Sequence, residues 1–250
     1  MELQQTESND ILASLSTDQQ SGLNRYGEDV PLNVGSILTE PSQMIDHIYF
    51  VRSGLVSLLV VLPDKTIADA GFVDHKAAIG CIYDVESPIS FTRDTVSAKG
   101  RALRISRENF EAFKHESVEF RRAIDKCCWI TTARSQQAAA CNLIHRLEER
   151  LCRWLLQISD ASCDSDVVVT QDHLSHILGV NRTRLNEAVK SLQTKDAISQ
   201  AQRGVFRIKD VKLIAAQACG CYTATKSMEL DKQSLLRDIC RIPDMVIRDI

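Results

Sequence analysis

The sequence of 250 residues predicts an α+β fold: an antiparallel β-roll, then one long helix, then a compact helical unit that ends in a hairpin. Three observations support this prediction. Short β-branched runs separated by turns occupy much of the first half, residues 117–144 contain no glycine or proline, and two short amphipathic patterns flank Gly179. A chain of this length can bury one large or two smaller cores, and we expect two domains.

The β-roll is predicted from residues 45–105. Ile48 and Phe50 alternate with other residues, residues 55–62 form a β-branched and leucine-rich run, and residues 95–105 have the same short-strand character. Closely spaced strands with turns between them indicate an antiparallel barrel or roll. We assign residues 25–115 to this domain and residues 1–24 to an N-terminal tail. The predicted turns are Ser53-Gly54, Pro63-Asp64-Lys65 and Lys99-Gly100.

Residues 116–144 are predicted to form a long helix and a hinge, with a helix length of about 40 Å. Apolar positions along it step by four and three, which is the spacing of a helix-pairing seam, and we expect the helix to pair with its copy in a dimer. The alternative is that the same stripe packs on the chain's own β-roll. The stripe consists of Phe120, Ile124, Cys127, Thr131, Ala138 and Cys141.

Residues 145–222 are predicted to form a second domain around a helix-turn-helix. A helix over residues 147–158 and a Ser- and Asp-rich loop precede it. Thr170 is a good N-cap for a short helix that stops at Gly179, and a second helix begins at about Asn181. Two short helices joined by a tight turn with a glycine satisfy the motif. Their buried stripes are Leu174, Ile177 and Leu178, and then Leu185, Ala188, Val189 and Leu192.

The face of the second helix opposite its buried stripe is wholly polar and predicts contact with DNA. Arg, Asn and Glu side chains can bond base edges in a major groove, and we assign base reading to Arg182, Thr183, Asn186 and Glu187. A hairpin over residues 197–208 would form a wing beside it. The alternative is a small helical unit whose polar face is merely solvated. Phosphate or wing contacts are assigned to Thr170, Gln171, Arg184, Lys190 and, at the wing tip, Arg203.

Charge and composition agree with this division. Residues 1–115 hold 10 Lys/Arg and 16 Asp/Glu, whereas residues 142–222 hold 11 and 9, so the sign changes in the half expected to meet phosphate. No apolar run is long enough to span a membrane, and residues 1–20 lack the pattern of a secretory signal. We expect a cytoplasmic protein. Residues 223–250 are interpreted as an extension with a polar linker and a short helix around residues 232–240, without an assigned role.

The nine cysteines are an odd number and are scattered, which disfavours a disulfide framework. Close spacings occur at Cys127-Cys128, at Cys141 with His145, and at Cys219-x-Cys221, but none repeats as the paired Cys-x-x-Cys of a structural zinc site. We therefore predict reduced, buried thiols and no metal or cofactor, with metal or redox sensing as the lesser alternative.

Several segments together resemble the Crp/Fnr superfamily of bacterial transcription regulators. They are TQDHL at residues 170–174 with LGVNRT at 178–183, ACNLIH at 140–145 leading into ERLCRWLL at 149–156, CGCY at 219–222, and IYFVRSG at 48–54. The resemblance spans roughly residues 25–222 and is to a branch common in alphaproteobacteria. It implies a cyclic-nucleotide-binding-like β-roll, a dimer through the long helix, and recognition helices that read a palindromic operator. At Glu187 many relatives have Arg.

The resemblance also indicates where an effector would bind. Members that respond to cyclic AMP hold its ribose with a Gly-Glu pair and its phosphate with a following Arg-Ser or Arg-Thr. Here Gly80 is followed by Cys81, and the nearby cation Arg93 is about two residues out of register. Ser135 and Gln136 on the long helix stand where relatives touch the base. We expect another small-molecule effector or none, and no iron-sulfur cluster, since no cysteine precedes Cys81.

The sequence therefore predicts a regulator that binds double-stranded DNA as a homodimer, contacts RNA polymerase and is not an enzyme. One rival is a ligand-sensing or protein-interaction module whose C-terminal domain does not read DNA. The other is a thiol or metal hydrolase that uses Cys141, His145 and Glu149, which step by four. No strained nucleophile turn or glycine-rich phosphate loop accompanies these residues, which disfavours the enzyme.

Overall fold

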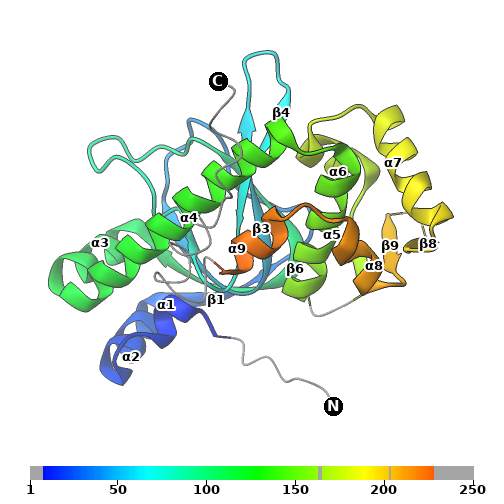
Figure 1. Cartoon of the computed structure of the whole chain (residues 1–250). Coiled ribbons are helices and arrows are strands. Elements are labelled where there is room, and N and C mark those ends of the chain that lie inside the picture. The colour runs from blue at the N-terminus through cyan, green and yellow to red at the C-terminus, as the bar shows by residue number, and fades with distance from the viewer. Residues whose placement is uncertain (1–7, 163–164, 203, 228–250) are drawn as a thin grey trace, which may run out of the picture.

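In the computed structural model, which describes residues 8–162, 165–202 and 204–227, the N-terminal half is an antiparallel β-roll (Figure 1). Its sheet has the strand order β1-β6-β3-β4, while β2 also pairs with β6 and β5 with β3. The predicted α+β class is seen directly. The strands are β1 (Gly27–Leu32), β2 (Ile37–Thr39), β3 (His47–Val61), β4 (Ile67–Val73), β5 (Ala78–Ile79) and β6 (Arg93–Ser106).

Strands β3 and β6 are the two longest strands of the roll, and they run straight through two positions where turns were predicted. The register runs from His47 opposite Ser106 to Leu59 opposite Arg93, with shifts around Ser53. Gly54 has φ of 83°, and a Cβ on Gly100 would lie 1.9 Å from the carbonyl oxygen of Ser53. The two glycines thus allow a β-bulge where the paired strands β3 and β6 approach closely. The predicted turns at Ser53-Gly54 and Lys99-Gly100 are therefore wrong, because both strands continue through these positions.

The segment predicted to be a tail folds into the first domain. Helices α1 (Asp10–Ala13) and α2 (Thr17–Tyr26) precede β1, and α3 (Arg107–Glu116) follows β6. Four apolar residues of this segment join the core of the roll because their side chains find an apolar surface there. They are Ile11, Leu12, Leu15 and Leu23, none more than 8% exposed.

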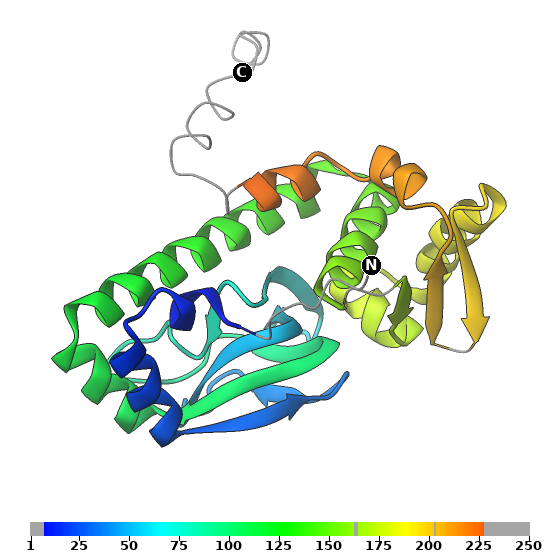
Figure 2. The ribbon, with the colours of Figure 1, turned by 90° about the horizontal axis from the view of Figure 1, so that it is seen from below.

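Helix α4 (Val118–Ile144) lies along the roll, as Figure 2 shows. The first half of the stripe predicted to pair two copies instead packs on the chain's own β-roll, where Phe120, Ile124 and Cys127 join the core. Thr131 and Ala138 are also buried, and Cys141 packs with Cys219 and Cys221 of the C-terminal domain. Arg134 on this face is 1% exposed, bonds Asp74 through two N–H···O contacts of 3.1 Å, and lies over the Phe72 ring. The outward face carries Trp129, Gln136 and Leu143, which are exposed and seven residues apart.

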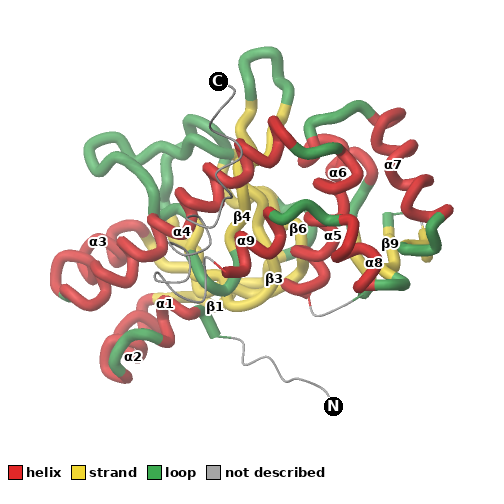
Figure 3. Tube along the Cα trace, viewed as in Figure 1, coloured by secondary structure: helices red, strands yellow, loops and turns green. Residues whose placement is uncertain are grey.

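The C-terminal domain is mainly helical and contains a small sheet of order β7-β9-β8 (Figure 3). Helix α5 runs four residues beyond the predicted end at 158, and β7 was not predicted. The predicted helix at 232–240 lies outside the described residues. The elements are α5 (Leu147–Ser162), β7 (Asp166–Val168), α6 (Gln171–Leu178), α7 (Arg182–Thr194), β8 (Ile198–Gln202), β9 (Val205–Ile208), α8 (Val211–Gln217) and α9 (Cys221–Ser227).

The two domains pack against each other through a shared apolar cluster and a buried polar network. Leu55, Leu59 and Phe72 of the roll pack in one cluster with residues of α5, α6 and α7. Within the network, Arg153 of α5 bonds the Asp69 carboxylate of β4 at 3.2 Å, and both side chains are under 10% exposed. Among the helices described, none is long and apolar enough to cross a membrane.

Candidate nucleic-acid interface

Helices α6 and α7 form the predicted helix-turn-helix, and their caps are the predicted ones. The Thr170 hydroxyl accepts the backbone N–H of His173 at 3.1 Å, and the Asn181 side chain accepts that of Arg184 at 2.9 Å. Gly179 ends α6 with φ of 62°, a left-handed conformation that favours glycine. The caps satisfy helix N–H groups that would otherwise lack partners, and they set the sharp turn between the helices.

The inner faces of α6 and α7 anchor the motif in the domain core. Leu174, Leu185 and Leu192 are fully buried, and Ile177 and Val189 are nearly so. Each such side chain contributes about 1.5–3 kcal/mol when it leaves water. Burial of this face leaves the opposite face of α7 at the edge of the molecule, away from the β-roll (Figure 1).

The structure exposes most of the residues predicted to read bases. Arg182, Thr183 and Glu187 are exposed, whereas Asn186 is half-buried at the side of α7. Arg182 forms an ion pair with Asp172 in the first turn of α6. Because both side chains are exposed, this pair contributes little to stability, and the guanidinium can exchange it for a contact with DNA.

Arg184 and Glu187 also line a groove between α7 and the start of α5. Its volume is about 540 Å³, and Arg146 and Glu149 lie on its other side. Arg184 therefore flanks the outer face of α7, and its role in phosphate contact stays a prediction. Glu187 is shared between the groove and the outer face, so this carboxylate places negative charge next to the predicted DNA surface.

The predicted phosphate contacts divide into three groups. Lys190 is exposed on α7, and its contact with phosphate stays a prediction. Thr170 uses its hydroxyl to cap α6, and Gln171 is half-buried beside it. The wing forms as β8 and β9, and Arg203, which was predicted to lie at its tip, is outside the described residues.

His173 holds the first helix of the motif on the β-roll. Its Nε2 lies 3.2 Å from the Ser97 hydroxyl of β6. Burial, with a smaller contribution from His176, lowers the pKa of His173 to about 4. The imidazole is therefore neutral near pH 7, which suits a contact with a hydroxyl inside a domain interface.

Of the four effector residues predicted by resemblance, Gly80 and Ser135 come together, whereas Arg93 and Gln136 do not join them. A cavity of about 250 Å³ between the roll and α4 is lined by Gly80, Asp94, Thr131 and Ser135 among others. Arg93 is not among the lining residues and pairs with Glu40 at 2.8 Å, while Gln136 is exposed on the outer face of α4. Asp94, which also lines this cavity, was not predicted, because its polar surroundings form only when β2 and β6 pair.

Asp94 gives this cavity an acidic character. The carboxylate accepts hydrogen bonds from the hydroxyls of Thr39 and Thr92, and the residue is 4% exposed. Burial raises the pKa of Asp94 to about 6, although these hydrogen bonds act in the opposite direction. Near pH 7 the group carries a negative charge, which opposes the binding of a phosphate anion.

The three residues of the hydrolase alternative do not form a catalytic unit. Cys141 and His145 lie close together, but the Glu149 carboxylate accepts the backbone N–H of Arg146 at 2.8 Å and caps the start of α5. Two further cysteines lie beside Cys141 and His145.

Comparison with known proteins identifies the C-terminal domain and the fold. Residues 149–216 match the family model of the Crp-like helix-turn-helix domain. The solved structure of a transcriptional regulator of the Crp/Fnr family from Eubacterium rectale is 12% identical, with a TM-score of 0.64, over 83% of this chain and 96% of its own. FixK2 from Bradyrhizobium japonicum is 11% identical, with a TM-score of 0.64, over 77% and 98%.

A third similar structure is CLP from Xanthomonas campestris, described as a c-di-GMP-responsive global regulator. It is 15% identical, with a TM-score of 0.62, over 78% of this chain and 100% of its own. No curated protein matches the chain in sequence. These structures confirm the predicted fold class, and the family model confirms the predicted resemblance for the helix-turn-helix domain at residues 149–216.

Proposed function

Since residues 149–216 form a Crp-like helix-turn-helix domain on a chain with the fold of Crp/Fnr transcription regulators, we propose that the protein binds a palindromic operator as a dimer. The observation that carries the proposal is the exposed polar face of α7, held at the edge of the molecule by two capped helices. The match to a family of regulators leaves no support for the hydrolase alternative.

Base reading is assigned to Arg182, Thr183, Asn186 and Glu187 at the first two turns of α7. In a helix-turn-helix the N-terminal residues of the second helix contact base edges, and these four positions fit that placement. Arg182 suits a guanine and Asn186 an adenine, while Glu187 would accept a hydrogen bond from cytosine. Arg184, Lys190 and the wing would contact phosphates on either side.

The dimer is proposed to form through the outward face of α4. Among the residues that the structure describes, Trp129 is 40% exposed and Leu143 is 83% exposed, so both large apolar side chains present surface to solvent. Positions seven residues apart stay on one side of a helix that pairs with its copy. Dimers with a helix-turn-helix bind half-sites about 34 Å apart, one turn of DNA, and the proposed two-fold axis along this face would present one α7 helix to each half-site.

We do not assign cyclic AMP as the effector. The cavity under α4 presents the Asp94 carboxylate, and the nearest predicted cation, Arg93, is paired elsewhere. A cyclic phosphate needs a cationic fork, and an unpaired buried anion beside it would be costly. RNA polymerase contact and a cytoplasmic location remain parts of the proposal that follow from a role at promoters.

Operator binding tests the proposal. We expect the purified protein to bind DNA from its own promoter with affinity that falls steeply as salt rises. Arg182→Ala should weaken binding by about 10- to 100-fold and relax preference at one base pair, while the matched control Arg25→Ala, on exposed α2, should bind like the wild type. Equal binding by Arg182→Ala and the wild type, or no affinity above background, would favour the protein-interaction alternative.

A further inference from the structure

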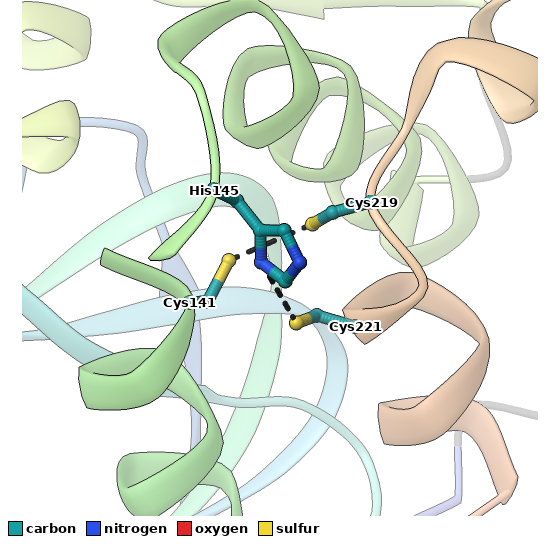
Figure 4. Close-up of side chains that lie close together, drawn as sticks. All are labelled: Cys141, His145, Cys219 and Cys221. Carbon is teal, nitrogen blue, oxygen red and sulfur yellow. Dashed lines mark hydrogen bonds between the residues drawn. The ribbon is translucent and has the colours of Figure 1, made fainter. Parts of the chain in front are cut away.

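Four metal-ligating side chains that lie far apart in the sequence converge beside the hinge, as Figure 4 shows. They are Cys141 in the last turn of α4, His145 at its end, Cys219 in the connection from α8 to α9, and Cys221 at the start of α9. Their ligand atoms all lie within 4.8 Å of one another. We call this group the Cys3His cluster, and we propose that it binds one Zn²⁺ ion that fastens the C-terminal domain to the long helix.

The spacing of the ligand atoms fits a single tetrahedral ion. The Cys141 and Cys219 sulfurs are 3.5 Å apart, and the Cys221 sulfur is 3.5 Å from Nδ1 of His145. With Zn–S of about 2.3 Å and Zn–N of about 2.0 Å, tetrahedral ligands lie about 3.5–3.8 Å from each other. A disulfide would need its two sulfurs at about 2.05 Å and would leave the third thiol and the imidazole without a role.

The chemistry of the donor set selects the metal. Three thiols and one imidazole match the Cys3His sets of structural zinc sites, whereas calcium and magnesium require oxygen ligands. The three cysteines are at most 6% exposed, so four protein ligands would close the site to solvent. Gln137 supports it from α4, since its side-chain N–H donates to the Cys221 sulfur at 2.9 Å.

The charges around the cluster also favour an anionic site. Arg150 and Arg153 are buried next to it, and the Asp69 carboxylate is the acidic group that pairs with Arg153. Arg150 donates to the Asn142 side chain at 3.0 Å and to the Leu178 carbonyl at 2.8 Å, and within the described ranges no salt bridge is found for it. Three thiolates and one Zn²⁺ carry a net charge of −1, which neutralises the remaining buried cation.

The position of the cluster gives the metal a structural consequence. Cys141 and His145 belong to the last turn of α4, and Cys219 and Cys221 follow the last element of the matched helix-turn-helix domain. α9 lies beside α4 in Figure 2, and the two helices are in contact. Zn²⁺ would therefore bridge the hinge at residues 145–146 and fix the domain that carries α7 relative to the dimer face of α4.

Metal content of the intact protein tests the proposal. We expect the full chain, purified under reducing conditions and desalted after addition of Zn²⁺, to retain about one ion per chain by mass spectrometry of the metal. Co²⁺ in its place should give the sulfur-to-cobalt charge transfer and visible d–d bands of a tetrahedral thiolate site. Cys141→Ser and Cys219→Ser should lose stoichiometric binding, whereas the control Cys128→Ser, a half-buried thiol on α4 outside the cluster, should keep it.

A conservative variant separates ligation from folding. His145→Cys should retain the ion and show stronger sulfur-to-cobalt absorption, because one nitrogen donor is replaced by sulfur. Gln137→Ala should retain the site with about tenfold lower metal affinity. Zn²⁺ should also protect Cys141, Cys219 and Cys221 from alkylation, but not Cys128, in a readout that does not depend on the variants.

Three results would overturn the proposal: wild-type protein without stoichiometric metal, Cys219→Ser with wild-type metal affinity, or a native Cys141–Cys219 disulfide that excludes the ion. None of these measurements uses DNA. If metal binds but the operator is not bound, the metal site stands and the proposed function fails. Loss of operator binding after zinc is removed, with recovery when zinc is added back, would show that the metal site supports DNA binding.

Discussion

At the scale of single residues, Asp94 and Arg93 show how neighbouring side chains on one strand take opposite roles. Arg93 points out to Glu40, and Asp94 is buried between Thr39 and Thr92 beside the cavity. Neighbours on a strand face opposite sides, so a shift of one residue exchanges a cation for an anion. This alternation explains why a chain with this fold need not recognise a phosphate.

Asp94→Asn should stabilise the fold at neutral pH. The folded-state pKa of Asp94 is about 6, above the ordinary aspartate value of 3.8, so the wild type loses stability as pH rises through that interval. The neutral amide avoids this cost, and we expect the variant to gain up to ~3 kcal/mol at pH 7.5 and nothing near pH 3.5. Urea unfolding at both pH values measures it. A difference independent of pH would contradict the explanation.

His173 should make the stability of the contact between α6 and the roll decrease at acidic pH. Its pKa is lowered from 6.5 to about 4, so the stability it provides is present above pH 6.5 and is lost as pH falls toward 4. His173→Asn keeps a polar contact with Ser97 and should remove this dependence. Hydrogen exchange of α6 amides between pH 7 and pH 4.5, compared in the two proteins, would check it; equal acid sensitivity would count against it.

At the scale of elements, the sequence predicts where helices begin and end better than it predicts which elements pack against each other. Caps at Thr170, Gly179 and Asn181 were predictable because their chemistry acts within one turn. The apolar stripe of α4 was equally visible, but its spacing does not say what covers it. In the structure the roll covers its first half, and the C-terminal domain covers Cys141. Cys141 and Cys219 meet only because the connection from α8 to α9 folds back beside the end of α4, so spacing along the chain could not show their cluster.

The exposed stripe of α4 should control the oligomeric state. Leu143→Glu places a charge where we expect two apolar side chains to meet, and desolvating that charge would disfavour association. We expect the wild type to be a dimer by light scattering at micromolar concentration and the variant to be a monomer. Val118→Glu, also an exposed apolar position on α4 but at its opposite end, serves as the control. A dimeric Leu143→Glu protein would place the interface elsewhere.

At the scale of the whole molecule, the two domains are joined by the buried pair of Asp69 and Arg153. Asp69→Ala would leave the Arg153 guanidinium buried without its carboxylate and should destabilise the protein by about 3–5 kcal/mol. Asp69→Ala combined with Arg153→Met should recover much of this loss, because the unpaired charge is gone. Urea unfolding of the single and double variants gives the coupling. An additive double variant would show that the pair does not join the domains.

Helix α4 also gives the molecule a mechanical axis. Ser135 lines the cavity between the roll and α4, and Cys141 belongs to the Cys3His cluster. Six residues of continuous helix, about 9 Å, separate the two residues. A helix hydrogen-bonded throughout transmits rotation with little internal slack. A ligand that rotates α4 at the cavity should therefore rotate the hinge and the C-terminal domain together with it, as one rigid body.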